Sequence, residues 1–244
     1  PEPCINASVQ REQGLHLAKR CRLFGINIQD GQDRHRDMAW LASILGHLAT
    51  DDQSNASGHI YSKLVQFLVS EDWWFWLNSS RSHFAEVERS DTKNFSHSHR
   101  LNVFATMGNG FCFELETIIF YALIWACVGK RHEDISVFGD DCIYPVEYVP
   151  LVHKAFKAVG FVINTSKSFS TGSFRESCGG DFLNGHNVRP IYLKRRFDNA
   201  YDLTIMANQI FSRFLQDQPA EWQITLYEKV VSLIDPKDRL WGPP

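Results

Sequence analysis

The sequence predicts an α+β fold, and three patterns lead to this expectation. Apolar residues recur at helical spacing in several stretches and are densest at residues 111–128. Apolar residues also alternate around Gly139-Asp140-Asp141, which is typical of a hairpin of two antiparallel strands. Because helices and strands are interleaved without a regular βαβ rhythm, the α+β class is favoured.

The elements follow from the spacing of apolar residues and from the glycines that end them. In the first half we expect a helix at 10–24 ending at Gly25, a polar turn-rich segment at 25–36, an apolar helical stretch at 38–48, a helix at 59–69, a core anchor with three tryptophans at 72–77, and a loop or short hairpin at 85–101. In the second half we expect a turn at 107–110, a helix at 111–128 closed by Gly129, a hairpin at 135–146, a helix at 149–159 before Gly160, a strand at 161–163, short strands from 177 to about 197, and helices at 199–234.

The bulk composition is that of an ordinary globular protein. Of the 244 residues, 44% are hydrophobic and 22% are charged, and the longest apolar run, residues 117–128, is too short to cross a bilayer. The six cysteines stand singly without a Cys-x-x-Cys spacing, so we expect reduced thiols rather than a zinc site or a disulfide scaffold. The chain begins with Pro1 and shows no signal peptide, which suggests a fragment or an incomplete reading frame.

The net charge of −3 does not mark the chain as a nucleic-acid binder. An enzyme that grips nucleic acid locally needs only basic patches where phosphates lie, however. Three short basic runs are candidates for such patches, at residues 19–22, 34–36 and 194–196. Each run taken alone is more typical of a solvated face than of a binding site.

Two acidic sites suggest metal chemistry. Asp140 and Asp141 lie at the predicted hairpin tip, where the alternative is a plain turn, and Asp51-Asp52 follows an apolar stretch, where the alternative is a helix N-cap or a loop. Two carboxylates about 4 Å apart repel by roughly 4 kcal/mol at an effective dielectric near 20, and a divalent cation would turn this repulsion into coordination. Oxygen ligands favour Mg²⁺ or Mn²⁺, and two such ions can activate an attacking hydroxyl and stabilise a leaving phosphate.

The segment Met107-Gly108-Asn109-Gly110-Phe111 is a candidate ligand loop just before a predicted helix. Its two glycines would let the backbone approach a ligand closely, and Asn109 could hydrogen-bond a sugar hydroxyl. The alternative is a simple Asn-Gly turn with no ligand.

Four segments in order resemble the replicases of leviviruses, the single-stranded RNA bacteriophages. Residues 52–57 (DQSNAS) resemble the first palm motif of that family, residues 107–116 (MGNGFCFELE) the second, and residues 138–141 (FGDD) the third. Residues 161–179, which end in SKSFSTGSFRESCG, are similar to the region that follows. The resemblance extends from near residue 2 to about residue 200, and the order of the motifs is more specific than any one of them.

This resemblance implies a fold and an activity. The chain would be part of the catalytic (beta) subunit of an RNA-directed RNA polymerase, with a right-hand fold that lacks the N-terminal fingers region. We expect a fingers remnant at 1–47, a catalytic palm with an antiparallel sheet at 48–197 and a partial thumb at 198–244. The implied reaction is template-directed nucleotidyl transfer from ribonucleoside triphosphates during replication of a viral RNA genome.

The resemblance also implies residue roles and partners. Asp52, Asp140 and Asp141 would be catalytic and would hold two Mg²⁺ ions, with Mn²⁺ as an alternative. Gly108, Asn109 and Gly110 would shape the nucleotide and template pocket, and Lys167 would protonate the departing pyrophosphate. Arg20 and Arg22 are weaker candidates for contact with the triphosphate. The implied partners are template RNA, nascent RNA, ribonucleoside triphosphates and host translation elongation factors, with no membrane, in the cytoplasm of an infected bacterium.

The sequence departs from the family pattern in two places. The family carries an aspartate after the Ala-Ser of the first motif, and this chain has Gly58 there. Asp51 beside Asp52 leaves the first metal ligand open, and we choose Asp52 because it fits the Asp-x-Ser-x-Ala-Ser spacing. Three other functions stay as alternatives: a reverse transcriptase, a non-catalytic RNA-binding remnant, and a metal-dependent phosphohydrolase.

Overall fold

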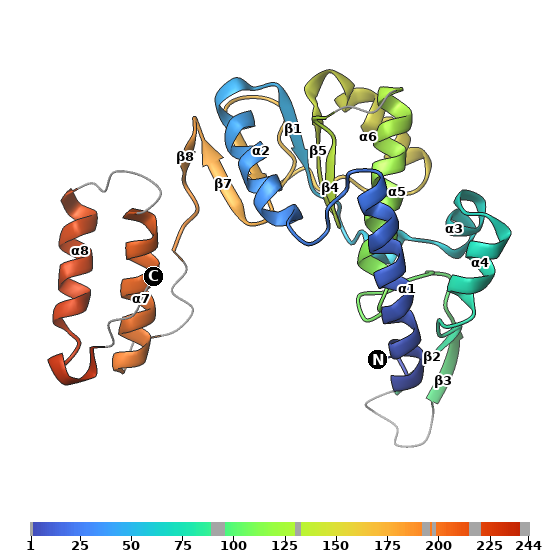
Figure 1. Ribbon diagram of the computed structural model, residues 1–244, viewed down its shortest axis with the longest axis horizontal. Helices are drawn as coiled ribbons and strands as arrows, with labels where there is room; N and C mark the ends of the chain where they lie inside the picture. Colours follow the sequence, from blue (N-terminus) through green and yellow to red (C-terminus); the bar gives the residue numbers. More distant parts are fainter. Residues whose placement is uncertain are drawn as a thin grey trace. The chain divides into compact units, whose positions relative to one another are not determined.

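Figure 1 shows a computed structural model of the chain, in which helices and small antiparallel sheets alternate along the sequence. The structure describes residues 2–88, 96–129, 133–191, 196, 199–214 and 221–239. The chain forms two compact units, Pro1–Gly185 and His186–Pro244. This mixture of helices and antiparallel strands is compatible with the α+β class that the sequence predicts.

The centre of the first unit is a three-stranded antiparallel sheet in the order β1-β5-β4. Strand β1 (Leu48–Asp51) pairs along its whole length with β5 (Asp141–Pro145), so that Asp51 lies opposite Cys142. Strand β4 (Ser136–Phe138) pairs with the other edge of β5. The hairpin predicted at 135–146 is therefore confirmed. Strand β1, which is far from this hairpin in the sequence, adds a third strand to it.

Alternation along the strands gives the sheet two apolar faces. Leu48 and Ile143 pack with Ala42 of α2 (Gly31–Leu45) in one buried cluster. Ala49, Cys142 and Tyr144 point to the opposite side, into the main core with residues of α5 (Cys112–Val128). The sheet is thus enclosed between helices on both sides, which explains why its strands are short and almost wholly buried.

Helix α5 is apolar on most of its circumference, and nine of its residues are buried. It packs against α1 (Cys4–Leu23) and α6 (Val149–Ala158) as well as the sheet. Gly129, with φ of 76°, adopts the left-handed conformation that ends it. The predictions of helices at 111–128 and 149–159 are confirmed, and a helix apolar on all sides is what a core position requires.

The remaining elements of the first unit surround this core. They are η1 (Ser57–His59), α3 (Ser62–Leu68), α4 (Glu71–Asn78), β2 (Phe84–Glu88), β3 (Ser96–Arg100), η2 (Val146–Tyr148), β6 (Phe174–Ser177) and β7 (Gly180–Leu183). The second unit contains β8 (His186–Asn187), α7 (Ala200–Phe214), α8 (Glu221–Ser232) and η3 (Pro236–Asp238), with Ala207, Ile210 and Val230 as its core. The alternative of a short hairpin at 85–101 is confirmed by β2 and β3, and the helices predicted at 199–234 by α7 and α8.

Several sequence expectations were wrong in detail. The first helix starts at Cys4 rather than residue 10, and α2 occupies residues from Gly31 that the prediction left in a turn. Helix α2 ends at Leu45 because Gly46 turns left-handed at φ 68°, which frees Leu48 to begin a strand. The first turns of α2 consist mostly of polar residues. They were not predicted as helical because the prediction relied on the spacing of apolar residues.

Three further expectations need correction. The helix predicted at 59–69 is broken into η1 and α3, because Tyr61 is extended between them. The tryptophan-rich segment is α4, but only Leu77 is fully buried and Phe75 is 77% exposed, so it is not a core anchor throughout. Residues 161–163 do not form a strand; Ile163 makes only an isolated bridge with Gln53.

Asp51 has a structural role at the end of β1. Its carboxylate is buried on the main-core side and accepts hydrogen bonds from the hydroxyl of Tyr144 and from Nε2 of His153, the latter at 2.8 Å. Tyr144 lies on β5 and His153 on α6, so Asp51 ties the sheet edge to that helix. A buried carboxylate without such donors would be costly, which makes this network specific for the observed strand register.

The Asp51–His153 pair predicts a pH dependence of stability. The hydrogen bond that His153 donates to Asp51 raises the pKa of His153 above its usual value despite partial burial. A histidine with a raised folded-state pKa stabilises the protein fully below its unfolded pKa, and this contribution is lost as the pH rises through the folded-state pKa. We therefore expect the free energy of unfolding, measured by urea denaturation, to fall more steeply above pH 6.5 in the parent than in His153→Gln. Parallel pH curves for the two proteins would contradict this.

Candidate active site

The tip of the β4–β5 hairpin is held against α5. Gly139 has a φ of 61°, and a Cβ placed on it would lie 2.5 Å from the ring of Phe113, so no other residue fits there without rearrangement. Its backbone N–H donates to Oγ1 of Thr117 at 3.0 Å. These contacts fix the loop that carries Asp140 and begins β5 with Asp141.

A turn between β6 and β7 orients Asp141. The backbone N–H of Cys178 donates to Oδ2 of Asp141 at 3.0 Å, and Cys178 adopts a left-handed φ of 48°. Helix α2 holds this turn from the other side: Nε of Arg36 donates to the carbonyl of Cys178 at 3.2 Å, and Nδ1 of His35 lies 2.9 Å from Oγ of Ser177. The position of Asp141 thus depends on residues from three separate segments.

The basic run at 34–36 is therefore largely structural. His35 is fully buried, and burial lowers its pKa to about 3, so it is neutral at physiological pH. Arg34 donates to the carbonyl of Glu133 at 3.0 Å, and Arg36 bonds both Asp33 and the turn. The alternative of a phosphate-binding patch does not fit His35. Of the run at 194–196, residues 194 and 195 lie outside the described residues.

Asp52 follows β1 and is held by the segment after residue 163. Nδ2 of Asn164 donates to Oδ2 of Asp52 at 2.7 Å, and the backbone N–H of Asn164 donates to the carbonyl of Asp52 at 2.9 Å. Two backbone hydrogen bonds between Thr50 and Phe169 extend this pairing. Because the carboxylate of Asp51 is committed to Tyr144 and His153, Asp52 is the better candidate for a ligand of the two.

The carboxylates of the hairpin act on one another electrostatically. Burial raises the pKa of Asp141, and the negative charges of Asp140 and Asp52 raise it further against the hydrogen bonds of Cys178. Burial and the charge of Asp52 also raise the pKa of Asp140. The structure therefore brings together three carboxylates that the sequence placed up to 89 positions apart, from Asp52 to Asp141.

Two glutamates that were not among the predicted site residues act on, or respond to, these carboxylates. Glu116 of α5 is 6% exposed, and burial together with Asp140 raises its pKa to about 8. Burial and the charge of Asp181 raise the pKa of Glu176, with smaller contributions from Asp141 and Asp52. The available sequence signal for Glu116 was a pair of glutamates, Glu114 and Glu116, at the start of an apolar helix, and the pattern did not tell which of them is buried.

Lys167 supplies positive charge to this acidic group. Its charge lowers the pKa of Asp140 and of Glu176 against the effects that raise them. The lysine is exposed, and its backbone N–H donates to the carbonyl of Asn164 at 3.0 Å. Asn164 therefore positions both Asp52 and Lys167, and the four catalytic candidates lie in one electrostatic neighbourhood.

The donor set fits a hard divalent cation in its chemistry. Asp52, Asp140 and Asp141 offer only oxygen atoms, which Mg²⁺ and Mn²⁺ prefer. A cation would relieve the repulsion that raises the pKa values of Asp140 and Asp141. In the described part of the chain, no three His, Cys, Asp or Glu side chains are gathered closely enough to ligate one ion. Binding would therefore require the carboxylates to draw together.

The glycine loop at 107–110 is fixed by α1 and by the start of α5. Oδ1 of Asn109 accepts from the backbone N–H of Phe111 at 3.0 Å, while Nδ2 of Asn109 is buried and has no hydrogen-bond partner among the described residues. A Cβ on Gly110 would lie 2.7 Å from the backbone nitrogen of Arg11, so this glycine serves packing against α1. Gly108 has open space around it. Among the described residues of this loop, Gly108 therefore leaves open space beside the backbone, whereas the amide of Asn109 is buried.

Gly58 lies beneath the side chain of Asn55. A Cβ on Gly58 would come within 2.4–2.7 Å of the amide group of Asn55, so any larger residue must displace that amide. Asn55 is exposed and has a left-handed φ of 51°. The space that a side chain at position 58 would use is therefore occupied by a polar group from a neighbouring residue.

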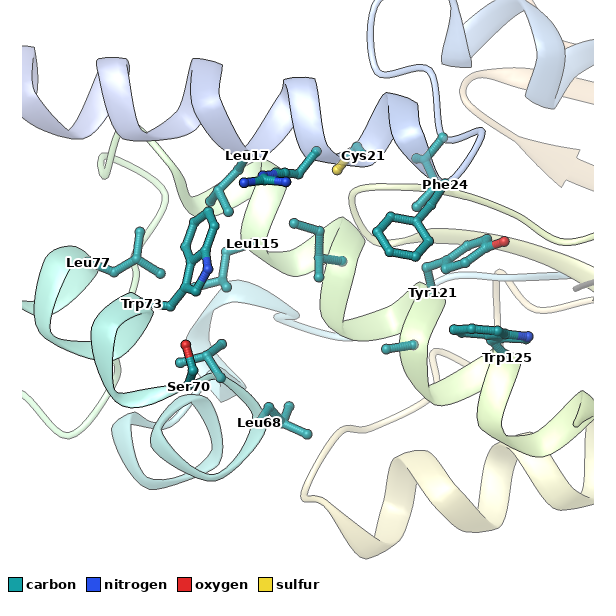
Figure 2. A pocket seen from close by; sticks show the side chains of 15 residues that line it. Leu17, Cys21, Phe24, Leu68, Ser70, Trp73, Leu77, Leu115, Tyr121 and Trp125 are labelled. Atoms are coloured by element: carbon teal, nitrogen blue, oxygen red, sulfur yellow. The ribbon is translucent and has the colours of Figure 1, made fainter. Parts of the chain in front are cut away.

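An apolar cavity of about 500 Å³ lies between α1, α4 and α5. Figure 2 shows Leu17, Trp73, Leu115 and Tyr121 facing it. Arg20 also lines this cavity, and Arg22 donates to Gln29. These contacts give the two arginines of the first basic run local roles on α1.

Comparison with known proteins gives the family. The family described as RNA replicase, beta-chain, matches residues 1–241. The chain belongs to this family. It is 38% identical over 212 residues to the RNA-directed RNA polymerase beta chain of Enterobacteria phage GA, covering 86% of this chain and 38% of the relative.

Two further relatives agree with this replicase assignment. The RNA-directed RNA polymerase beta chain of Escherichia phage MS2 is 36% identical over 212 residues, with 86% of this chain and 37% of the relative covered. The RNA-directed RNA polymerase subunit beta of Escherichia virus Qbeta is 34% identical over 213 residues, with 86% and 35% covered. The replicase chain thus spans somewhat more than a third of the length of these relatives. No helix in the described residues is long and apolar enough to span a membrane.

Proposed function

We propose that the chain is the catalytic part of an RNA-directed RNA polymerase that replicates a viral RNA genome. The observation that carries this proposal is the placement of Asp52, Asp140 and Asp141 at the ends of neighbouring antiparallel strands, where their charges act together with that of Lys167. The similarity to named RNA-directed RNA polymerase beta chains supports the same activity. The alternative of a metal-dependent phosphohydrolase does not account for the resemblance of several motifs, in order, to those of a polymerase family.

In the proposed reaction, a primer-end hydroxyl attacks the α-phosphate of a ribonucleoside triphosphate and pyrophosphate leaves. Asp52, Asp140 and Asp141 would hold two Mg²⁺ ions, with Mn²⁺ as an alternative. When bound, the ions would activate the attacking hydroxyl and neutralise charge on the leaving phosphate. The chain itself supplies positioning: the turn at Cys178 orients Asp141, and Asn164 orients Asp52.

Lys167 is the proposed general acid. Its charge acts on Asp140, so its ammonium group is near the proposed metal ligands. A lysine there could give a proton to the departing pyrophosphate. Asn109, whose buried Nδ2 has no hydrogen-bond partner in the described part of the chain, is the proposed contact to the ribose. Gly108 and Gly110 would shape the nucleotide and template pocket, Gly108 through the open space beside it and Gly110 through its close packing on α1.

The proposal includes a right-hand architecture and its partners. We assign residues 1–47 to a fingers remnant, 48–197 to the palm and 198–244 to part of the thumb. The proposed ligands are template RNA, nascent RNA and ribonucleoside triphosphates, and the proposed partners are host translation elongation factors. The proposed site of action is the cytoplasm of an infected bacterium.

Asp140→Asn tests the metal site. The substitution is nearly isosteric and removes one proposed ligand, so we expect RNA-templated extension with Mg²⁺ by the complete subunit to be abolished. Thermal unfolding should occur at the same or a higher temperature, because neutralising a carboxylate whose pKa is raised relieves repulsion in the fold. Asp72→Asn on exposed α4 is the matched control and should extend normally. Near-normal extension by Asp140→Asn would remove the assignment.

Lys167→Leu tests the general acid. Loss of a positioned acid typically costs about 10²- to 10⁴-fold in rate. We expect the single-turnover rate of nucleotide addition to fall within that range and its pH dependence to flatten. Lys157→Leu, on the exposed end of α6, is the control. A single-turnover rate equal to that of the parent would mean that Lys167 is an ordinary surface lysine.

Gly58→Asp tests sugar selection. The resemblance to palm polymerases implies an aspartate here that would help recognise the ribose 2′-hydroxyl together with Asn109. Loss of a hydrogen bond to a charged group costs roughly 1.5–3 kcal/mol, or about ten- to a hundredfold in selectivity. We expect a weakened preference for ribonucleotides in the parent and a higher ratio of ribonucleotide to deoxyribonucleotide incorporation in Gly58→Asp.

Gly58→Ala is the control for this substitution. Its Cβ also displaces the amide of Asn55 but brings no carboxylate, so it separates the effect of moving Asn55 from the effect of the new charge. Equal and high incorporation ratios in the parent and in Gly58→Asp would exclude any role of position 58 in sugar selection.

A further inference from the structure

A second hollow, of about 400 Å³, lies among α3, α4 and the base of the β2–β3 hairpin. In Figure 1 these elements lie beside one another, apart from the β4–β5 hairpin that carries the carboxylates. Among the described residues that line the hollow, none is acidic and four are basic: Lys63, Arg81, His83 and Arg100. This lining is unusual in a chain whose net charge is −3.

The basic groups of the hollow act on one another as like charges. Burial lowers the pKa of Arg81, and the charge of Arg100 lowers it further as the smallest of the three effects on it; burial and the charges of both arginines lower the pKa of His83. Glu2 opposes this effect on Arg81, but its carboxylate also accepts a hydrogen bond from Ser82 at 2.6 Å. Among the described residues, neither Lys63 nor Arg100 forms an ion pair with a carboxylate. An anion in the hollow would relieve the repulsion.

Arg81 is held as a rigid donor at the wall of the hollow. It is only 8% exposed; Nε donates to Oδ1 of Asn78 at 2.8 Å, and Nη1 donates to the carbonyl of Val103 at 3.3 Å. Its guanidinium lies 5.1 Å from the ring centroid of Phe104. None of its hydrogen bonds within the described residues uses Nη2. Most of the entropy of ordering this side chain is thus lost on folding rather than on binding.

The walls of the hollow are joined by backbone hydrogen bonds. The N–H of Ser62 donates to the carbonyl of Asn102 at 2.9 Å, and the N–H of Leu101 donates to the carbonyl of His83 at 2.9 Å. Trp74 of α4 lines the same hollow and packs on Phe104, with the ring centroids 5.1 Å apart. The site therefore combines fixed positive charge with an aromatic ring and amide side chains, and its volume exceeds what one phosphate group needs.

We propose that this hollow binds single-stranded RNA, with Lys63, Arg81 and Arg100 contacting a backbone phosphate and Trp74 contacting an adjacent base. Basic groups with an interleaved aromatic ring suit single-stranded nucleic acid, because the phosphate gains charge contacts and any base can stack. The three basic runs visible in the sequence lie elsewhere, and these residues come together only in the fold. The identification of the ligand as RNA rests on the proposed polymerase function, whereas the inference that the hollow binds an anion does not.

The test is binding of a fluorescein-labelled single-stranded 12-mer RNA, followed by fluorescence anisotropy at several salt concentrations. We expect Lys63→Gln and Arg100→Gln each to weaken binding about tenfold and to reduce the slope of log affinity against log salt by about 0.7. Lys157→Gln, an exposed lysine on α6, is the matched control and should bind as the parent does. Circular dichroism and thermal unfolding check that each variant is folded.

The outcomes separate this site from the polymerase proposal. Parent-like RNA affinity in both pocket variants would overturn the RNA site, even if the complete subunit extends RNA. Loss of ATP binding in these variants with unchanged RNA binding would also overturn it, since the hollow would then take free nucleotides. If the pocket variants lose RNA affinity while Asp140→Asn keeps it, the hollow is an RNA site whether or not the parent extends RNA.

Discussion

Like charge held in one place is the constraint on which the rest of this structure depends. Burial raises the pKa of Asp140 and of Asp141; the charge of Asp52 raises both further, and the charge of Asp140 also raises that of Asp141. If the segments that carry these carboxylates were not held by the rest of the fold, the repulsion would drive them apart. The fold opposes this with three tethers: the N–H of Cys178 on Asp141, the amide of Asn164 on Asp52, and the fixed hairpin tip at Gly139. Each tether comes from a different part of the sequence.

The two faces of the central sheet serve these tethers differently. On the side of α2, His35 and Arg36 hold the turn that carries Cys178. On the side of α5 and α6, the buried Asp51 binds Tyr144 and His153, which fixes the register of β1 against β5. A shift of that register by one residue would exchange the faces of Asp51 and Asp52. Two adjacent aspartates therefore have opposite tasks, one in holding the strand and the other beside the proposed catalytic cluster.

The sequence predicted those features whose pattern lies within a short stretch of the chain. The hairpin around Asp140, the helix at 111–128 and its end at Gly129 follow from alternation, apolar spacing and glycine chemistry within about 20 residues. The choice of Asp52 as the proposed metal ligand came from motif spacing. The structure supports this choice, because the carboxylate of Asp51 already accepts hydrogen bonds from Tyr144 and His153. Three features depend on contacts across more than 20 residues, which no local pattern encodes: the interaction of Glu116 with Asp140, the roles of His35 and Arg36, and the pairing of β1 with β5.

The same limit explains the basic hollow. Runs of adjacent lysines and arginines are easy to see, yet the run at 34–36 includes a buried neutral histidine and an arginine bonded to a carbonyl. Lys63, Arg81 and Arg100 are separated by 18 and 19 positions and become neighbours only because α3, α4 and the β2–β3 hairpin pack together. A chain with net charge −3 can thus keep acidic residues where cations would bind and basic residues where an RNA backbone would lie. Local charge in the folded chain, rather than total charge, is what decides its partners.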